Sequence, residues 1–146
     1  MDSELEPQLG HFVTAMLTQM SDRGPDSAGI AIYGDVVDQG LLKYSCRSDD
    51  RNFDWISLAA KCGTRLVRHG EGVVLTGVPG LQSQIEAHDV SIISTGVAVE
   101  VFKDVGAPIS VLERFDIESR VGYQGVGHTR LATESAITTD GSHPFS

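Results

Sequence analysis

The chain has 146 residues, enough for one domain with a buried core but too few for two domains of ordinary size. Its net charge is −9 and its basic residues are scattered along the sequence, which argues against a nucleic-acid-binding protein. No apolar run reaches membrane-spanning length, and the acidic start (Asp2, Glu4, Glu6) differs from the basic head of a signal peptide. We therefore expect a cytoplasmic globular protein without nucleic-acid or membrane partners.

Apolar residues at helical spacing predict a first helix over residues 9–20. Its buried stripe is expected to consist of Leu9, Phe12, Val13, Met16, Leu17 and Met20. The segment SDRGPDSAG (21–29) ends this helix, because Gly24-Pro25 cannot continue it and the neighbouring Asp and Ser residues favour turns. Arg23 stands between Asp22 and Asp26, and hydrogen bonds among these residues alone would explain the corner.

The middle of the chain alternates between strand-like and helix-like patterns. We expect strands at 27–34 and 41–46 that form a hairpin, a strand at 73–78, and one long strand at 90–102. A helix capped by Asn52 or Asp54 should run to Gly70, with an inner face of Trp55, Leu58, Ala59, Cys62 and Leu66. Pro108 opens a short helix that buries Val111, Leu112 and Phe115, and a glycine-rich strand follows at 122–132. Helices on both sides of hairpin-like strands predict an α+β fold with helices layered on an antiparallel sheet.

Cys46 and Cys62 lie sixteen residues apart, with no CxxC pair and no paired histidines. This spacing suits neither a disulfide framework nor a zinc site. We therefore expect two buried, reduced thiols, and no metal or cofactor.

Arg130 ends an apolar, strand-like run and is followed by small and hydroxylated residues, Thr133 and Ser135 among them. A guanidinium carries a rigid fork of donors that matches a carboxylate with two parallel hydrogen bonds. The segment therefore indicates a site for the carboxylate of a small metabolite. A surface ion pair with Glu134 explains the same local pattern.

The residues around Arg130 indicate no further chemistry by themselves. His128 fits a core position on a strand, and His143 fits a turn before Pro144. The spacing Gly125-x-Gly127 resembles a fragment of a phosphate loop, but no helix-opening glycine and no GxxxxGK[ST] motif accompany it. A nucleotide-binding α/β domain is therefore only a weak interpretation.

Two separated segments together carry a resemblance to a known family. RGPDSAGIAIY (23–33) and GVGHTRLATES…DGSHPF (125–145) are similar to the class II glutamine amidotransferases, the N-terminal-nucleophile glutaminase domains. The residues of the first segment look closest to those of amidotransferase subunits related to glutamate synthase and N-methylglutamate synthase. The resemblance implies an Ntn-hydrolase-type αββα sandwich, with residues 1–146 as a partial type-2 domain and a variable insert at about 47–120.

The resemblance also assigns site residues. Arg130 matches the arginine that grips the α-carboxylate of glutamine, and Thr133 matches the threonine that lines the same pocket. Supporting positions are expected at Arg23, Gly24, Asp26, His128 and His143. Glu134 departs from the family, which often has His after the threonine.

The ends of the chain depart further from the family pattern. The family nucleophile is a Cys at mature position one, whose own amine serves as the base, and a downstream Asn-Gly pair supplies the oxyanion hole. Here Asp2 follows Met1 and the sequence stops at Ser146, so both features are absent. We expect an internal piece that is incomplete at both ends, has no catalytic residue of its own, and self-associates through unpaired strand edges.

The implied function is hydrolysis of the glutamine side-chain amide, with delivery of ammonia to a synthase subunit or domain. The expected partners are glutamine and that synthase, in an oligomer. The alternative is a non-catalytic amino-acid-binding or interaction subunit that keeps Arg130 and has lost the thiol.

Overall fold

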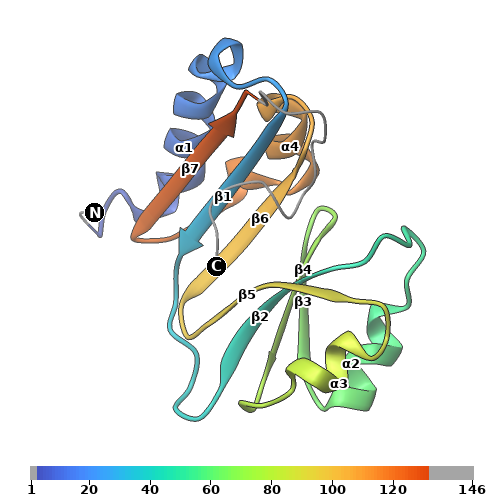
Figure 1. Cartoon of the computed structure of the whole chain (residues 1–146). Coiled ribbons are helices and arrows are strands. Elements are labelled where there is room, and N and C mark those ends of the chain that lie inside the picture. The colour runs from blue at the N-terminus through green and yellow to red at the C-terminus, as the bar shows by residue number, and fades with distance from the viewer. Residues whose placement is uncertain (1–2, 132–146) are drawn as a thin grey trace.

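The computed structural model describes residues 3–131 and shows a mixed α/β fold (Figure 1). Within these residues, seven strands form two antiparallel sheets, accompanied by four α-helices and three short 3-10 helices, Glu6–Gln8, Ser21–Arg23 and Ile117–Ser119. The expected combination of helices with antiparallel sheet is confirmed at this level. None of the helices described has the length and apolar character needed to cross a bilayer.

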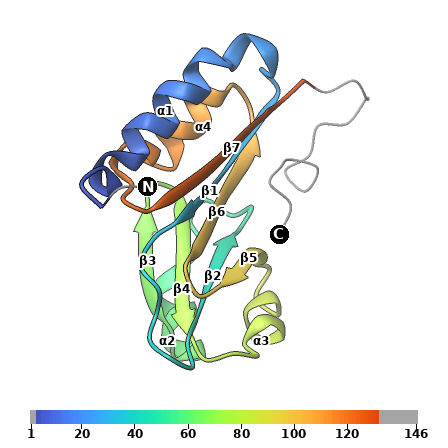
Figure 2. The same ribbon diagram turned by 90° about the vertical axis from the view of Figure 1, so that its left-hand side faces the viewer.

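The first sheet has three strands in the order β6-β1-β7. These strands are β6 (Val99–Val105), β1 (Ser27–Tyr33) and β7 (Gln124–Arg130), and β1 is antiparallel to both neighbours. Helices α1 (Leu9–Gln19) and α4 (Pro108–Arg114) cover one face of this sheet, as Figures 1 and 2 show. The core between them contains Leu9, Val13, Leu17, Ala28, Ile30, Ile32, Phe102, Val111, Leu112, Phe115 and Ile117.

The contact between α1 and β7 explains the glycines of the last strand. A Cβ atom on Gly125 would lie 2.7 Å from Val13, and one on Gly127 would lie 2.8 Å from Leu17. The close approach at these two glycines is therefore made by helix side chains, whereas at Gly122 it is made by backbone, since an added Cβ there would lie 2.4 Å from the Tyr33 carbonyl oxygen. The buried stripe of α1 is narrower than its apolar pattern, and the assignment of Met16 and Met20 to the core is wrong, since they are 60% and 41% exposed.

The second sheet has four strands in the order β3-β4-β2-β5. Its strands are β2 (Leu42–Arg47), β3 (Arg65–His69), β4 (Gly72–Gly77) and β5 (Ser91–Gly96), and two helices pack against it, α2 (Trp55–Cys62) and α3 (Gln82–Glu86). Their shared core is Tyr44, Cys46, Trp55, Leu58, Ala59, Cys62, Val73, Leu75, Ile85 and Val90.

Two strand predictions are wrong because the segments that they join belong to different sheets. Residues 27–46 do not form a hairpin, because β6 and β7 occupy both edges of β1 and β2 joins the other sheet. The single strand expected at 90–102 is divided into β5 and β6, which belong to different sheets. The two crossings between the sheets lie side by side, with Gly34 N–H donating to the Ala98 carbonyl at 3.1 Å and Val37 N–H donating to the Val97 carbonyl at 2.9 Å.

The helix after Asp54 is shorter than expected. The Asp54 carboxylate caps α2 by accepting from the Ser57 backbone N–H at 3.0 Å, as the sequence predicts. Gly63 then adopts the left-handed conformation, with φ of 62°, and ends the helix before Gly70. Leu66 consequently lies in β3, a strand that the sequence pattern did not indicate, and α3 was also missed.

The outer edge of β6 is covered by the second sheet. The Val101 backbone N–H donates to Ser45 Oγ of β2 at 3.0 Å, and the Lys43 Nζ lies 2.8 Å from Glu100 Oε1. The second sheet therefore covers the edge of β6 at Val101, while β7 is the other edge of the three-stranded sheet within the described residues.

Candidate functional site

The two segments that carry the family resemblance meet at one end of the three-stranded sheet. Asp26 N–H donates to the Arg130 carbonyl at 3.1 Å, and Ser27 pairs with Arg130 across β1 and β7. Gly24 is buried against the same strand, where an added Cβ would lie 2.6 Å from the Arg130 nitrogen and the Thr129 carbonyl carbon. Only glycine fits this contact, so the backbone of the corner fixes the end of β7.

Arg23 does not form the hydrogen bonds with Asp22 and Asp26 that the sequence of the corner suggests. Its side chain is exposed and forms no ion pair with Asp22 or Asp26 in the described structure. The corner is held by backbone hydrogen bonds, including Arg23 N–H to the Met20 carbonyl at 3.0 Å. Asp26 also accepts from the Gly106 N–H at 2.8 Å through its carbonyl, which ties the corner to the end of β6.

Strand alternation places several basic groups on the face of the sheet opposite α1 and α4. His128 and Arg130 lie on this face because the intervening residues, Gly127 and Thr129, lie on the helix-facing side. Lys103 and His128 are both in register with Gly29, one on each side of it. The Ser27 hydroxyl on the same face is buried and has no hydrogen-bond partner in the described structure. This end of the sheet therefore presents cationic groups around a floor of small residues.

The structure thus brings together Arg23, Gly24, Asp26, His128 and Arg130. Thr133 and His143 lie outside the described residues, as does Glu134, the proposed surface partner of Arg130. Lys103 was missed by sequence reasoning. A lysine in an otherwise apolar strand, VAVEVFK, is the signal that could have found it.

The two cysteines are placed as expected, free and buried in the core of the second sheet. Burial, with smaller contributions from Cys62 and Glu86, raises the pKa of the Cys46 thiol to about 12. Burial also raises the pKa of Cys62. Because the thiolate is the nucleophilic form, neither cysteine is activated for attack on a carbonyl.

A second group of polar side chains, which we call the buried ion cluster, lies between the two sheets. It consists of Lys43, His69, Glu100 and Arg120. Glu100 pairs with Lys43 through one oxygen and with Arg120 through the other, and Arg120 also contacts the ring of His69. The Arg120 guanidinium lies 5.5 Å from the centre of the Phe102 ring.

Burial dominates the protonation of this cluster. It lowers the pKa of His69, the Arg120 cation lowers it further, and Glu100 opposes the shift. Burial likewise lowers the pKa of Arg120, against the effect of Glu100. The cluster borders a cavity of about 640 Å³. Sequence reasoning missed it, although Lys43 and Glu100 each interrupt an apolar strand pattern.

Metal binding has no support in the described residues, where no group of three or more His, Cys, Asp or Glu side chains is placed to hold an ion. The two groups of polar side chains described so far are the corner around Arg130 and the buried ion cluster.

Comparisons with known proteins give two relatives. Glutamine amidotransferase-like protein GlxB of Rhizobium meliloti (strain 1021) is 44% identical over 157 aligned positions, covering 99% of this chain and 52% of that protein. A putative glutamine amidotransferase of Methanothermobacter thermautotrophicus (strain Delta H) is 27% identical, covering 94% of this chain and 51% of that protein. The chain spans about half the length of these relatives, and no protein-family model matches it. Both relatives are thus named as glutamine amidotransferases or as similar to them.

Proposed function

We propose that this chain forms the glutamine-binding part of a class II glutamine amidotransferase, with Arg130 holding the α-carboxylate of glutamine. The observation that carries the proposal is the contact between the two family-like segments, where the corner at Gly24–Asp26 packs on Arg130. They are about a hundred residues apart in sequence, and their contact is what a shared substrate pocket requires. The similarity to amidotransferase-like proteins supports the same assignment.

The finer features of the family are part of this proposal. We assign the chain to the Ntn-hydrolase αββα class, as a partial type-2 domain, and Thr133 joins Arg130 in the substrate pocket. Arg23, Gly24, Asp26, His128 and His143 support that pocket. The helix layers on each sheet are consistent with this class.

The reaction we propose for the whole protein is hydrolysis of the glutamine side-chain amide. A thiolate adds to the amide carbon, ammonia leaves from the resulting tetrahedral oxyanion, and water releases glutamate from the thioester. The ammonia passes to a glutamate-synthase-related subunit or domain in a cytoplasmic oligomer. The part of this chemistry that the chain supplies is the grip on the substrate carboxylate.

Substitution of Arg130 tests the assignment. Arg130→Ala removes a bidentate, charge-assisted interaction, which is worth about 1.5–3 kcal/mol per hydrogen bond to a charged group. The glutamine KM should therefore rise by about two to four orders of magnitude, or the Kd should rise equally in calorimetry where no ammonia is released. Arg130→Lys should recover only part of the loss, because an ammonium lacks the planar fork.

A matched control is available on another strand. Arg65→Ala removes an exposed arginine from β3 and should leave glutamine binding unchanged. Equal glutamine affinity in the parent protein and in Arg130→Ala would sink the assignment.

The alternative is a non-catalytic amino-acid-binding or interaction subunit. Saturable glutamine binding without release of ammonia would support this alternative, whereas production of glutamate would exclude it.

A further inference from the structure

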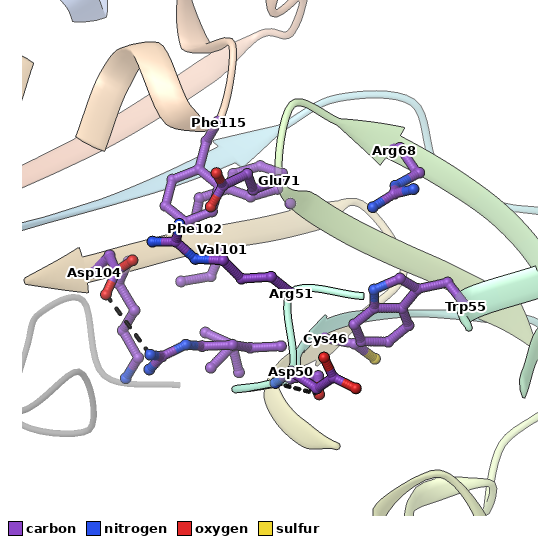
Figure 3. Close-up of a pocket in the computed structure, with 15 residues that line it drawn as sticks. Cys46, Asp50, Arg51, Trp55, Arg68, Glu71, Val101, Phe102, Asp104 and Phe115 are labelled. Carbon is purple, nitrogen blue, oxygen red and sulfur yellow. Dashed lines mark hydrogen bonds and ion pairs between the residues drawn. The ribbon is translucent and has the colours of Figure 1, made fainter. Parts of the chain in front are cut away.

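A second pocket lies at the outer edge of β6, beyond the point where β2 covers that edge. The pairing of β2 with β5 is irregular between Ser45 and Cys46, and the Ser45 hydroxyl makes the contact to Val101. Past this point β2 and β6 border a pocket of about 150 Å³ (Figure 3). We call it the arginine pocket. Its lining includes Arg47, Arg51, Trp55, Arg68 and Lys103.

Positive charge is concentrated in this pocket. Four of the eleven Lys and Arg residues of an otherwise acidic chain line it: Arg47, Arg51, Arg68 and Lys103. Arg51, Arg68 and Lys103 form no ion pair with any residue of the described structure. Like charges that converge without counterions repel one another, so an anion that enters the pocket would relieve this repulsion.

Three carboxylates also line the pocket, and two of them are already paired. Asp104 is bound by Arg114 and lies 3.9 Å from Arg47, and Glu71 lies 3.8 Å from Arg114. Asp50 accepts from the Asn52 backbone N–H at 2.9 Å, within its own turn. Asp104 and Glu71 are thus directed to Arg114, so the three cations Arg51, Arg68 and Lys103 outnumber the one remaining carboxylate of the lining, Asp50.

Trp55 supplies an independent observation. The residue is 6% exposed, and its indole N–H makes no hydrogen bond in the described structure, although the nitrogen itself is accessible. Figure 3 shows the indole nitrogen on the side of the ring that faces the pocket. The indole N–H therefore offers the pocket one more hydrogen-bond donor.

The backbone of β6 adds another donor. Val101 and Val105 both direct their N–H groups away from β1, to Ser45 Oγ at 3.0 Å and to Asp104 Oδ1 at 2.8 Å. Because N–H direction alternates along a strand, the N–H of Lys103 points the same way, out from the open part of this edge. Lys103 thus offers both its ammonium group and its backbone amide.

We propose that the arginine pocket binds the phosphate group of a small metabolite. A carboxylate is planar and is satisfied by one guanidinium fork, whereas a tetrahedral phosphate dianion accepts hydrogen bonds from several directions. The donors here come from the loop after β2, from α2, from β3 and from β6, and so approach from different sides. The volume suits a phosphate with a few further atoms. The pocket shares Lys103 with the sheet face that carries Arg130, but its arginines belong to the second sheet and the loop after it, and the proposal stands without the proposed glutamine chemistry.

The chain provides its own probe for this binding. Trp55 is the single tryptophan, so a fluorescence titration with inorganic phosphate reports directly on the pocket. We expect a saturable change in emission with phosphate at constant ionic strength, with competition from sulfate and none from chloride. Calorimetry with the same phosphate should give the same Kd. If neither measurement shows saturable binding, the proposal is wrong.

Variants localise the binding. Arg51→Ala and Arg68→Ala should each weaken phosphate binding by about tenfold, in keeping with the loss of one charge-assisted contact. Arg65→Ala, three residues before Arg68 on β3 and outside the pocket, is the matched control and should bind like the parent protein. Equal affinities in all three variants would place the phosphate elsewhere and overturn the assignment. Tighter binding of succinate than of phosphate would overturn the choice of anion.

Discussion

The buried ion cluster and the arginine pocket use the same kinds of side chain on the same strand with opposite outcomes. Glu100 of β6 meets Lys43 and Arg120, so these buried charges are neutralised within the protein. Three residues along β6, Lys103 joins Arg51 and Arg68 in a pocket, and these three cations form no ion pair in the described structure. Charges that satisfy one another indicate a structural role, whereas charges left without counterions indicate a missing ligand.

The largest effect on stability is expected for Glu100→Gln, which breaks the buried ion cluster. It leaves Lys43 and Arg120 buried without their carboxylate, which should lower the free energy of unfolding by about 3–5 kcal/mol. Urea denaturation measures the loss, and Glu113→Gln on the exposed side of α4 should change it by less than about 0.5 kcal/mol. A loss below about 1 kcal/mol for Glu100→Gln would mean that the cluster does not hold the sheets together.

A smaller effect on the free energy of unfolding is expected from the protonation of His69 in the buried ion cluster. His69 has a pKa below its ordinary value of 6.5, because it is buried beside Arg120. As the pH falls below about 6.5, the unfolded chain takes up a proton on this histidine that the folded chain does not, so the free energy of unfolding decreases. His69→Gln should remove this part of the decrease in urea denaturation at pH 7.5, 6.5 and 5.5. An unchanged pH profile would contradict the assignment, and His88→Gln is the control.

The smallest expected effect concerns the arginine pocket without ligand. The double variant Arg51→Ala with Arg68→Ala should change the free energy of unfolding by less than about 0.5 kcal/mol, because both side chains are exposed and unpaired. Thermal and urea denaturation in phosphate-free buffer measure it. A loss above about 2 kcal/mol would make these arginines structural, and the contrast with the buried ion cluster would disappear.

The outcomes of the sequence predictions follow from what local pattern encodes. The spacing of Leu9, Val13 and Leu17 predicted α1 correctly, since helix periodicity depends on neighbouring residues alone. The same reasoning failed for β1 and β2, whose patterns identify strands but not their partners. The assignment of Met16 to the core was wrong, because the width of a buried stripe depends on the opposing surface, here a strand whose glycines lie against Leu9, Val13 and Leu17.

The candidate sites divide in the same way. Arg130 and the Gly24 corner were found through a family-like pair of segments, and the structure places them in contact. The ion cluster and the arginine pocket were not found, because their members come from distant strands and each single charge looks like a solvated side chain. Lys43, Glu100 and Lys103 interrupt apolar strands, which signals a buried charge without naming its partner.

The adjacent crossings at Gly34 and Ala98 have a consequence for how the chain folds. Tyr33 and Val99 are directly paired, so β1 and β6 form an antiparallel hairpin whose loop contains the entire second sheet. Closing a loop of about 65 residues costs roughly 2.4 kcal/mol more chain entropy than closing one of four residues. Folding the inserted sheet first brings the ends of that loop together and removes most of this cost. The inserted sheet would then act as the nucleus, and the layer that carries Arg130 would assemble after it.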